Sequence, residues 1–139
     1  MIDFISAVKS ILEEQNKTTE NLFKDNVVSE NTFYKYKQRY PSLKTLVKVA
    51  NYLAVSIDYL FELSDENNFV PYSIDNNKFY NNLISLIENA NISCRKFCQD
   101  LHFSRDNVIR WKNRTQPSLQ VLFEIAEYFG CTIDDLLKS

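Results

Sequence analysis

Positively charged side chains gather in two short stretches of the chain, and each stretch contains a single acid. The basic residues are Lys35, Lys37 and Arg39 in the first stretch and Arg105, Arg110, Lys112 and Arg114 in the second. The acids are Glu30 and Asp106. Clustered Lys and Arg can neutralise phosphate groups. Because the chain has a net charge of −2 and a pI of about 5.4, any basic face must be local.

Cysteine and histidine side chains follow one another at four-residue steps, as Cys94, Cys98 and His102. A structural zinc site needs converging ligands, usually four. Cys98 stands where a small residue would pack between two helices, and His102 stands in the turn beyond them. We therefore predict that Cys98 is buried and that the chain holds no metal. With Cys131 the cysteines number three, and this odd count without a secretory signal predicts no disulfide framework.

Catalytic chemistry has little support among these residues. His102 is the only histidine and has no evident partner, so no Ser-His-Asp arrangement can be argued. The single glycine argues against a glycine-rich phosphate loop. Trp111 is predicted to be a core residue rather than a stacking platform. We therefore predict no enzyme activity and no cofactor.

An internal repeat positions the two basic stretches. Residues 33–63 and 108–139 share one pattern, which is clearest where Pro41-Ser42-Leu43 matches Pro117-Ser118-Leu119. One inserted residue in the loop before Pro117 explains a slip in register. Such a repeat predicts two similar modules in the chain of 139 residues.

Apolar residues at helical spacing predict an all-α chain with five helices in each half. In the first half these helices cover about 2–14, 18–25, 29–38, 42–53 and 56–60. In the second they begin at 77, 93, 104, 118 and 132. The expected N-caps are Thr18, Ser29, Ser42, Ser56, Ser93, Ser104, Ser118 and Thr132. Thr132 and Asp135 additionally form a capping-box pattern.

The predicted domains are residues 1–64 and 77–139, joined by a linker over residues 65–76. Fully extended, this linker would reach at most ~45 Å. Its apolar residues Phe69, Val70, Tyr72 and Ile74 are expected to pack between the halves.

Each half contains a short helix, a tight turn and a second short helix, over residues 18–37 and 93–112. Two short helices packed at a steep angle leave the second exposed on one face, where it fits the major groove of DNA. The helix order, the serine before the third helix, the Pro-Ser-Leu start of the fourth and the Ile-Asp-x-Leu ending resemble the phage repressor and Cro-like (XRE-like) helix-turn-helix family. The resemblance covers nearly the whole chain in two copies. It implies two tandem five-helix lambda-repressor-like domains.

The same resemblance implies roles for individual residues. Base-reading candidates are Glu30, Asn31, Tyr34 and Lys35 in the first half and Arg105, Asp106, Ile109 and Arg110 in the second. Phosphate-facing candidates at the start of the second helix of each half are Thr18, Thr19, Ser93 and Cys94. Flanking contacts to the DNA backbone would come from Lys37, Arg39, Lys112 and Arg114. Tyr34 is expected to face outward.

The function that these observations favour is a sequence-specific DNA-binding transcription regulator with two recognition helices in one chain. Its partners would be double-stranded DNA and, as a further possibility, a homodimer mate or another protein. The alternative is a protein-interaction module, such as an antirepressor or regulatory partner, that keeps the fold without binding DNA. Acidic pI, Cys94 and the aromatic first recognition helix favour that alternative. In a split version, only the second half binds DNA.

The N-terminus lacks signal-peptide features, and no stretch is long enough to span a bilayer. We therefore expect a cytoplasmic protein without a membrane partner.

Overall fold

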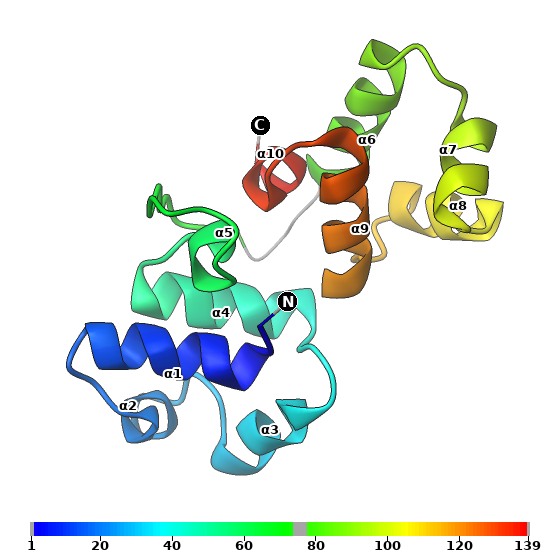
Figure 1. Cartoon of the computed structure of the whole chain (residues 1–139). Coiled ribbons are helices and arrows are strands. Elements are labelled where there is room, and N and C mark those ends of the chain that lie inside the picture. The colour runs from blue at the N-terminus through cyan, green and yellow to red at the C-terminus, as the bar shows by residue number, and fades with distance from the viewer. Residues whose placement is uncertain (1, 74–77, 139) are drawn as a thin grey trace. The chain divides into compact units, whose positions relative to one another are not determined.

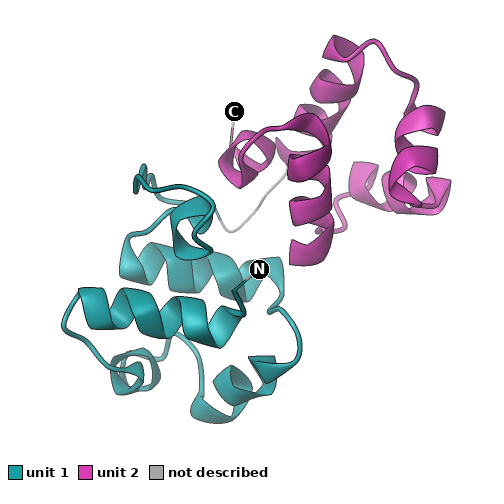
Figure 2. Ribbon diagram, viewed as in Figure 1, with its two compact units in different colours: residues 1–74 teal, residues 75–139 magenta. Residues whose placement is uncertain are grey.

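The computed structural model describes residues 2–73 and 78–138. Every regular element within these residues is a helix, which confirms the predicted all-α class. The chain divides into two compact units, residues 1–74 and residues 75–139 (Figure 2). None of the described helices is both long and apolar enough to cross a membrane.

The first unit contains five α-helices and one 3-10 helix (Figure 1). They are α1 (Phe4–Glu14), α2 (Thr19–Lys24), α3 (Glu30–Tyr34), η1 (Lys35–Lys37), α4 (Leu43–Leu53) and α5 (Ile57–Leu60). α1 packs against α5 and η1. The inward stripes of α1 and α4 supply most of the core, in which Phe4, Leu46 and Ile57 are fully buried.

The second unit repeats this order of α-helices. Its elements are α6 (Lys78–Asn89), α7 (Cys94–Leu101), α8 (Arg105–Lys112), α9 (Leu119–Phe129) and α10 (Ile133–Leu137). α10 packs against α6 and α9, α7 packs against α9, and α6 packs against α8. Leu83, Phe97 and Leu122 are fully buried at the centre of these contacts. α8 is thereby held by the core along one side only.

Seven of the eight predicted N-caps are confirmed. Each of the seven side chains accepts a hydrogen bond from the backbone N–H three residues later. A cap of this kind satisfies one of the donors that a helix leaves unpaired at its start. The capping box is also present, since the Asp135 carboxylate accepts from the Thr132 N–H at 3.0 Å. Cap residues therefore define where most helices begin.

Left-handed backbone positions recur at equivalent places in the two units. Positive φ angles follow the first helix at Asn16 and Asn91, with values of 57° and 56°. They recur after the second helix at Asn26 and His102, and after the fourth at Ala54 and Gly130. Since each of these residues turns the chain at the end of a helix, the two units share their loop geometry as well as their helix order.

One aromatic pair holds the third helical segment of each unit against the first helix. The rings of Phe4 and Tyr36 lie 5.5 Å apart at 86°. Those of Phe79 and Trp111 lie 5.4 Å apart, also at 86°. Edge-to-face packing is a favoured geometry for aromatic pairs. Trp111 is only 7% exposed, so its prediction as a core residue is confirmed.

Residues 65–73, predicted to belong to the linker, fold back onto the first unit. The Asn67 side chain accepts a hydrogen bond from the Ser56 N–H at 2.9 Å. The Tyr72 hydroxyl accepts one from the Ile57 N–H at 2.8 Å. Both donors lie at the start of α5, where a helix has no partners of its own for its N–H groups. Residues 65–73 therefore pack on the first unit, through hydrogen bonds to the start of α5.

The apolar residues of this segment differ in their surroundings. Tyr72 is buried and exchanges two backbone-to-side-chain hydrogen bonds with Asn51, of 2.8 and 3.1 Å. Phe69 is half-buried, whereas Val70 is 58% exposed. Ile74 lies outside the described residues. Tyr72 thus packs into the first unit itself.

Candidate nucleic-acid interface

In the second unit, α7 and α8 are separated by a tight turn of three residues. His102 ends α7 with a φ of 59°, in the left-handed region. The Ser104 hydroxyl then caps α8 by accepting from the Asn107 N–H at 3.3 Å. The turn therefore combines a left-handed residue with an N-cap only two positions later. This is a helix-turn-helix built by local backbone chemistry.

α8 buries one side and exposes the other. Val108 and Trp111, three residues apart, face the core and are 8% and 7% exposed. The predicted base-reading residues of this helix, Arg105, Asp106, Ile109 and Arg110, are all exposed. They share the outer face because three- and four-residue steps follow the helical repeat. Of these, Ile109 is a 54% exposed apolar residue among cations, which suits contact with a surface of mixed polarity.

The cations of α8 and its exit are not neutralised by the protein's own acids. Among the described residues, none of Arg105, Arg110, Lys112 and Arg114 forms an ion pair. The two ion pairs present there, Lys96–Asp100 and Lys138–Asp134, lie on α7 and at the end of α10. An acidic chain can therefore still present a local basic face.

In the first unit, the predicted helix over 29–38 is shorter and changes type. α3 ends at Tyr34, and the chain continues as the 3-10 helix η1. Phe33 and Tyr36 both contact Phe4, with ring centroids 6.1 and 5.5 Å away. Phe33 lies in α3 and Tyr36 in η1, so rings on both sides of the change in helix type contact the same partner.

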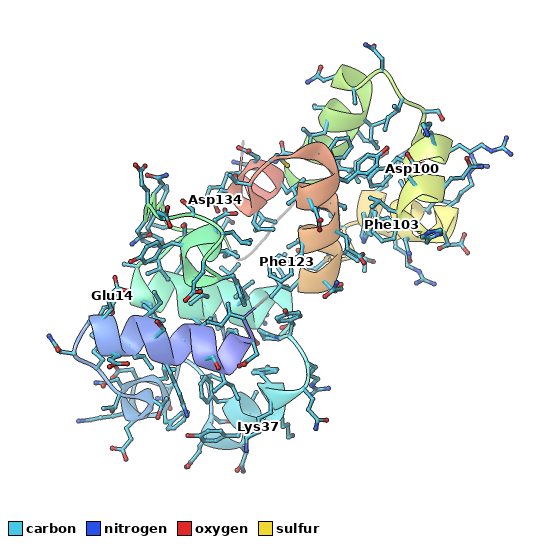
Figure 3. All side chains as sticks on the ribbon, in the orientation of Figure 1. Glu14, Lys37, Asp100, Phe103, Phe123 and Asp134 are labelled. Atoms are coloured by element: carbon cyan, nitrogen blue, oxygen red, sulfur yellow. The ribbon has the colours of Figure 1, made fainter. Side chains whose placement is uncertain are left out.

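Tyr34 was expected to face outward, but its ring is half-buried. It packs against Phe33 with ring centroids 5.3 Å apart. The ammonium groups of Lys9 and Lys37 lie 5.9 and 5.8 Å from the centroid of its ring. These are cation–π distances. The tyrosine therefore holds two lysines, one from α1 and one from η1, beside the third helix (Figure 3 labels Lys37).

Lys9 is a site candidate that the sequence did not indicate. It lies on α1, and the nearest basic residue predicted for the site, Lys35, is distant along the chain. Only the fold brings Lys9 to Tyr34, so no local pattern could have marked it. The other predicted residues of this unit, Glu30, Asn31, Lys35, Lys37 and Arg39, are exposed.

The phosphate-facing candidates lie at the starts of α2 and α7. Thr18, Ser93 and Cys94 are exposed, and Thr19 is half-buried. The Thr18 N–H donates to the Asn21 side chain at 3.0 Å, whereas the Ser93 hydroxyl accepts from the Lys96 N–H at 3.0 Å. Each helix start is therefore already capped from within the chain.

Cys98 is 4% exposed, which confirms the prediction of a buried thiol. Burial raises its pKa, and the neighbouring thiol of Cys94 raises it further. A raised pKa keeps the thiol protonated at neutral pH, whereas the thiolate is the form that binds metals. No three His, Cys, Asp or Glu side chains converge on a possible metal position in the part of the chain that the structure describes.

Residues 82–139 match the family model of the Cro/C1-type HTH DNA-binding domain. The matched segment lies in the second unit and includes α7 and α8. No curated protein and no solved structure matches the chain.

Proposed function

We propose that this chain is a sequence-specific, DNA-binding transcription regulator. The observation that carries the proposal is the exposed face of α8. This face carries Arg105, Ile109 and Arg110, and neither arginine forms an ion pair among the described residues. The helix lies inside the segment that matches a Cro/C1-type DNA-binding domain. A helix of this length, capped and held by the core on one side, can enter the major groove with its first turns toward the bases.

The exposed side chains of α8 differ in the bases that they can contact. Arg105 and Arg110 can each donate two hydrogen bonds to the O6 and N7 atoms of a guanine. Asp106 can accept from the amino group of cytosine, and Ile109 can contact a thymine methyl group. Ser93 and Cys94 would meet phosphates at the start of α7, and Lys112 and Arg114 would flank the backbone.

The first unit is proposed as a second DNA-contacting copy. Its support is the shared helix order, the matching left-handed positions and the matching aromatic pair. Asn31 and Lys35 would approach the bases, with Glu30 beside them. Thr18, Thr19, Lys37 and Arg39 would approach phosphates. Because α3 and α8 differ in nearly every exposed residue, we expect an asymmetric binding site rather than a palindrome.

A second candidate, favoured for the first unit alone, is a protein-interaction role. The observation behind it is the α3 helix of five residues, whose Tyr34 packs back onto the unit instead of projecting from it. In that case only the second unit would contact DNA.

The decisive experiment combines selection of bound sequences from random duplex DNA with two substitutions of Arg110. Arg110→Ala removes both charge and base contact, and should weaken binding to the selected site by about 1–3 kcal/mol. Arg110→Lys keeps the positive charge but removes the planar group that donates two hydrogen bonds to one guanine. It should retain the salt dependence of binding while losing preference at one position of the site.

Two outcomes would count against this function. Failure of the pure protein to retain any DNA at low salt would favour the interaction module. Retention without enrichment of a sequence would leave only non-specific binding through phosphates.

A further inference from the structure

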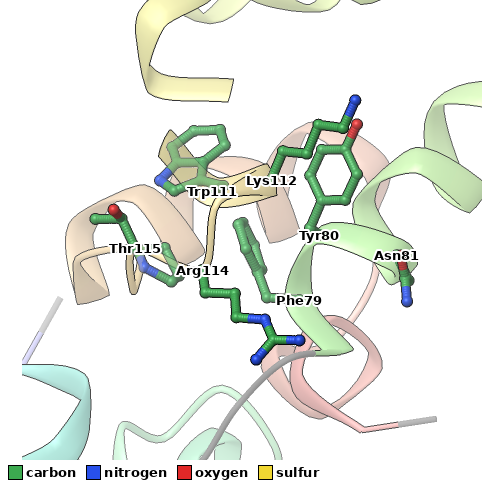
Figure 4. Close-up of a pocket in the computed structure, with 8 residues that line it drawn as sticks. Phe79, Tyr80, Asn81, Trp111, Lys112, Arg114 and Thr115 are labelled. Atoms are coloured by element: carbon green, nitrogen blue, oxygen red, sulfur yellow. The ribbon is translucent and has the colours of Figure 1, made fainter. Parts of the chain in front are cut away.

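A cleft of about 220 Å³ opens in the second unit at the end of α8, between the start of α6 and residues 112–117 (Figure 4). Its apolar lining comes from Phe79, Tyr80, Trp111 and Pro117. Phe79, Trp111 and Pro117 are buried, whereas Tyr80 is half-buried. Aromatic side chains that the unit already holds in place therefore form part of the cleft wall.

The polar lining of this cleft includes two cations beside the uncharged Asn81 and Thr115. Lys112 and Arg114 both line it and are both exposed. Figure 4 shows that they leave the backbone in different directions, which places positive charge on two sides of the cleft. Among the described residues, no carboxylate lines the cleft and neither cation has an ion-pair partner.

The loop that shapes the cleft is specific to the second unit. Six positions separate Trp111 from Pro117, whereas five separate the equivalent Tyr36 from Pro41 (117 − 111 = 6 and 41 − 36 = 5). Arg114 takes a φ of 72°, and no residue between Tyr36 and Pro41 has a positive φ. Like the left-handed residues that end other helices of this chain, Arg114 turns the backbone after α8, and the Thr115 N–H donates to the Arg110 carbonyl at 2.9 Å.

We propose that this cleft binds a small aromatic acid. An apolar ring would lie against the aromatic side chains, and its carboxylate would pair with the Arg114 guanidinium, to which the Lys112 ammonium adds positive charge. The volume is below the ~300–1,000 Å³ of sites for drug-sized ligands, so a single ring with one acidic group fits best.

Binding at this place has a consequence that rests on the proposed function. Lys112 and Arg114 are also the proposed contacts to the DNA backbone, so a bound acid would compete with phosphates for the same two charges. Occupancy of the cleft should therefore lower the affinity for DNA.

The test uses the full chain and its only tryptophan, because Trp111 lines the cleft. Tryptophan fluorescence is followed during titration with benzoate at constant ionic strength, without DNA. Benzamide tests the need for charge, and acetate and phosphate test the need for the ring. We expect a saturable change with benzoate and at least tenfold weaker responses to the other three.

Arg114→Gly is the matched variant, because glycine adopts a positive φ readily and the substitution removes only the side chain. It should weaken benzoate binding at least tenfold, whereas Arg39→Ala, at the corresponding exit in the first unit, should leave it unchanged. A change that never saturates, equal binding by Arg114→Gly, or phosphate binding as strong as that of benzoate would each overturn the proposal.

A second arm measures DNA affinity with and without benzoate. Lower affinity in the unmodified chain, but not in Arg114→Gly, supports competition. If benzoate binds and DNA affinity stays constant, the competition is refuted while the cleft site stands. If benzoate binds and the chain retains no DNA, the proposed function fails while the cleft site again stands.

Discussion

At the scale of single residues, polar side chains of this protein stabilise one another across helices as well as within them. The Tyr128 hydroxyl on α9 donates to the Asp100 carboxylate on α7 at 2.7 Å, and Lys96 pairs with the same carboxylate at 3.2 Å (Figure 3 labels Asp100). These two contacts hold the pKa of Asp100 below its ordinary value, and the hydrogen bond from Tyr128 has the larger effect. The same bond raises the pKa of Tyr128.

This geometry predicts that Tyr128→Phe raises the pKa of Asp100 toward its ordinary value, because the largest stabilisation of the carboxylate is lost. A folded-state pKa that is depressed contributes stability above the unfolded-state pKa and loses it as pH falls through the folded-state pKa. The stability difference between the two proteins should therefore shrink on acidification through that range. An NMR titration of the Asp100 carboxyl carbon and urea unfolding at several pH values measure these effects.

The matched control is Tyr52→Phe, which removes the equivalent tyrosine hydroxyl of the first unit, bonded there to Asp25. It should leave the pKa of Asp100 unchanged. An Asp100 pKa that is the same in Tyr128→Phe and in the unmodified chain would show that the hydroxyl does not act on the carboxylate.

At the scale of helices and turns, the two units end their fourth helix in the same backbone conformation but with different residues. The fourth helix ends in a left-handed residue in both, at Ala54 with φ 55° and at Gly130 with φ 65°. A Cβ is unfavourable in this conformation by roughly 1–2 kcal/mol, and glycine avoids that cost at the expense of some chain entropy.

Exchanging these residues should therefore shift stability in opposite directions. Ala54→Gly should raise the free energy of unfolding by about 0.5–1 kcal/mol, and Gly130→Ala should lower it by about 1 kcal/mol. A Cβ added at Gly130 meets nothing within 4 Å, so its cost comes from the backbone alone. Urea unfolding followed by circular dichroism measures the first change, and Trp111 fluorescence the second. Shifts of the same sign in both variants would contradict this account.

Some features of the helices could be predicted from short stretches of sequence, and others could not. The serine caps and the buried Trp111 follow from residue type and spacing, because capping and helical periodicity are local properties. The break of α3 at Tyr34 could not be predicted in this way. On either side of the break, Phe33 and Tyr36 contact Phe4, which lies on another helix.

At the scale of the whole molecule, the distribution of charge matters more than its sum. The net charge of −2 would disfavour binding to phosphates if it were spread evenly. The cations of η1 instead directly follow the proposed recognition helix α3, and those of α8 lie on the proposed recognition helix itself. If both units contact DNA, both should contribute to the salt dependence of binding.

The triple variant Lys35→Ala, Lys37→Ala, Arg39→Ala tests that contribution. Each phosphate contact adds about 0.9 to the slope of log K against log salt concentration, so loss of the two proposed contacts from Lys37 and Arg39 should lower the slope by up to ~2. A gel-shift or fluorescence-anisotropy series at several salt concentrations measures it. Lys48→Ala, an exposed lysine on α4, is the control and should leave the slope unchanged. An unchanged slope in the triple variant would assign DNA binding to the second unit alone.

The amino-acid sequence by itself determined the helical class, the repeat, the positions of the caps and the exposure of the α8 cations. These follow from periodicity and side-chain chemistry along a few consecutive residues. Only the tertiary structure placed Lys9 beside Tyr34, folded Tyr72 onto the start of α5 and opened the cleft beside Trp111. Each of these joins residues from different elements, and such contacts depend on how whole helices pack and not on local preference.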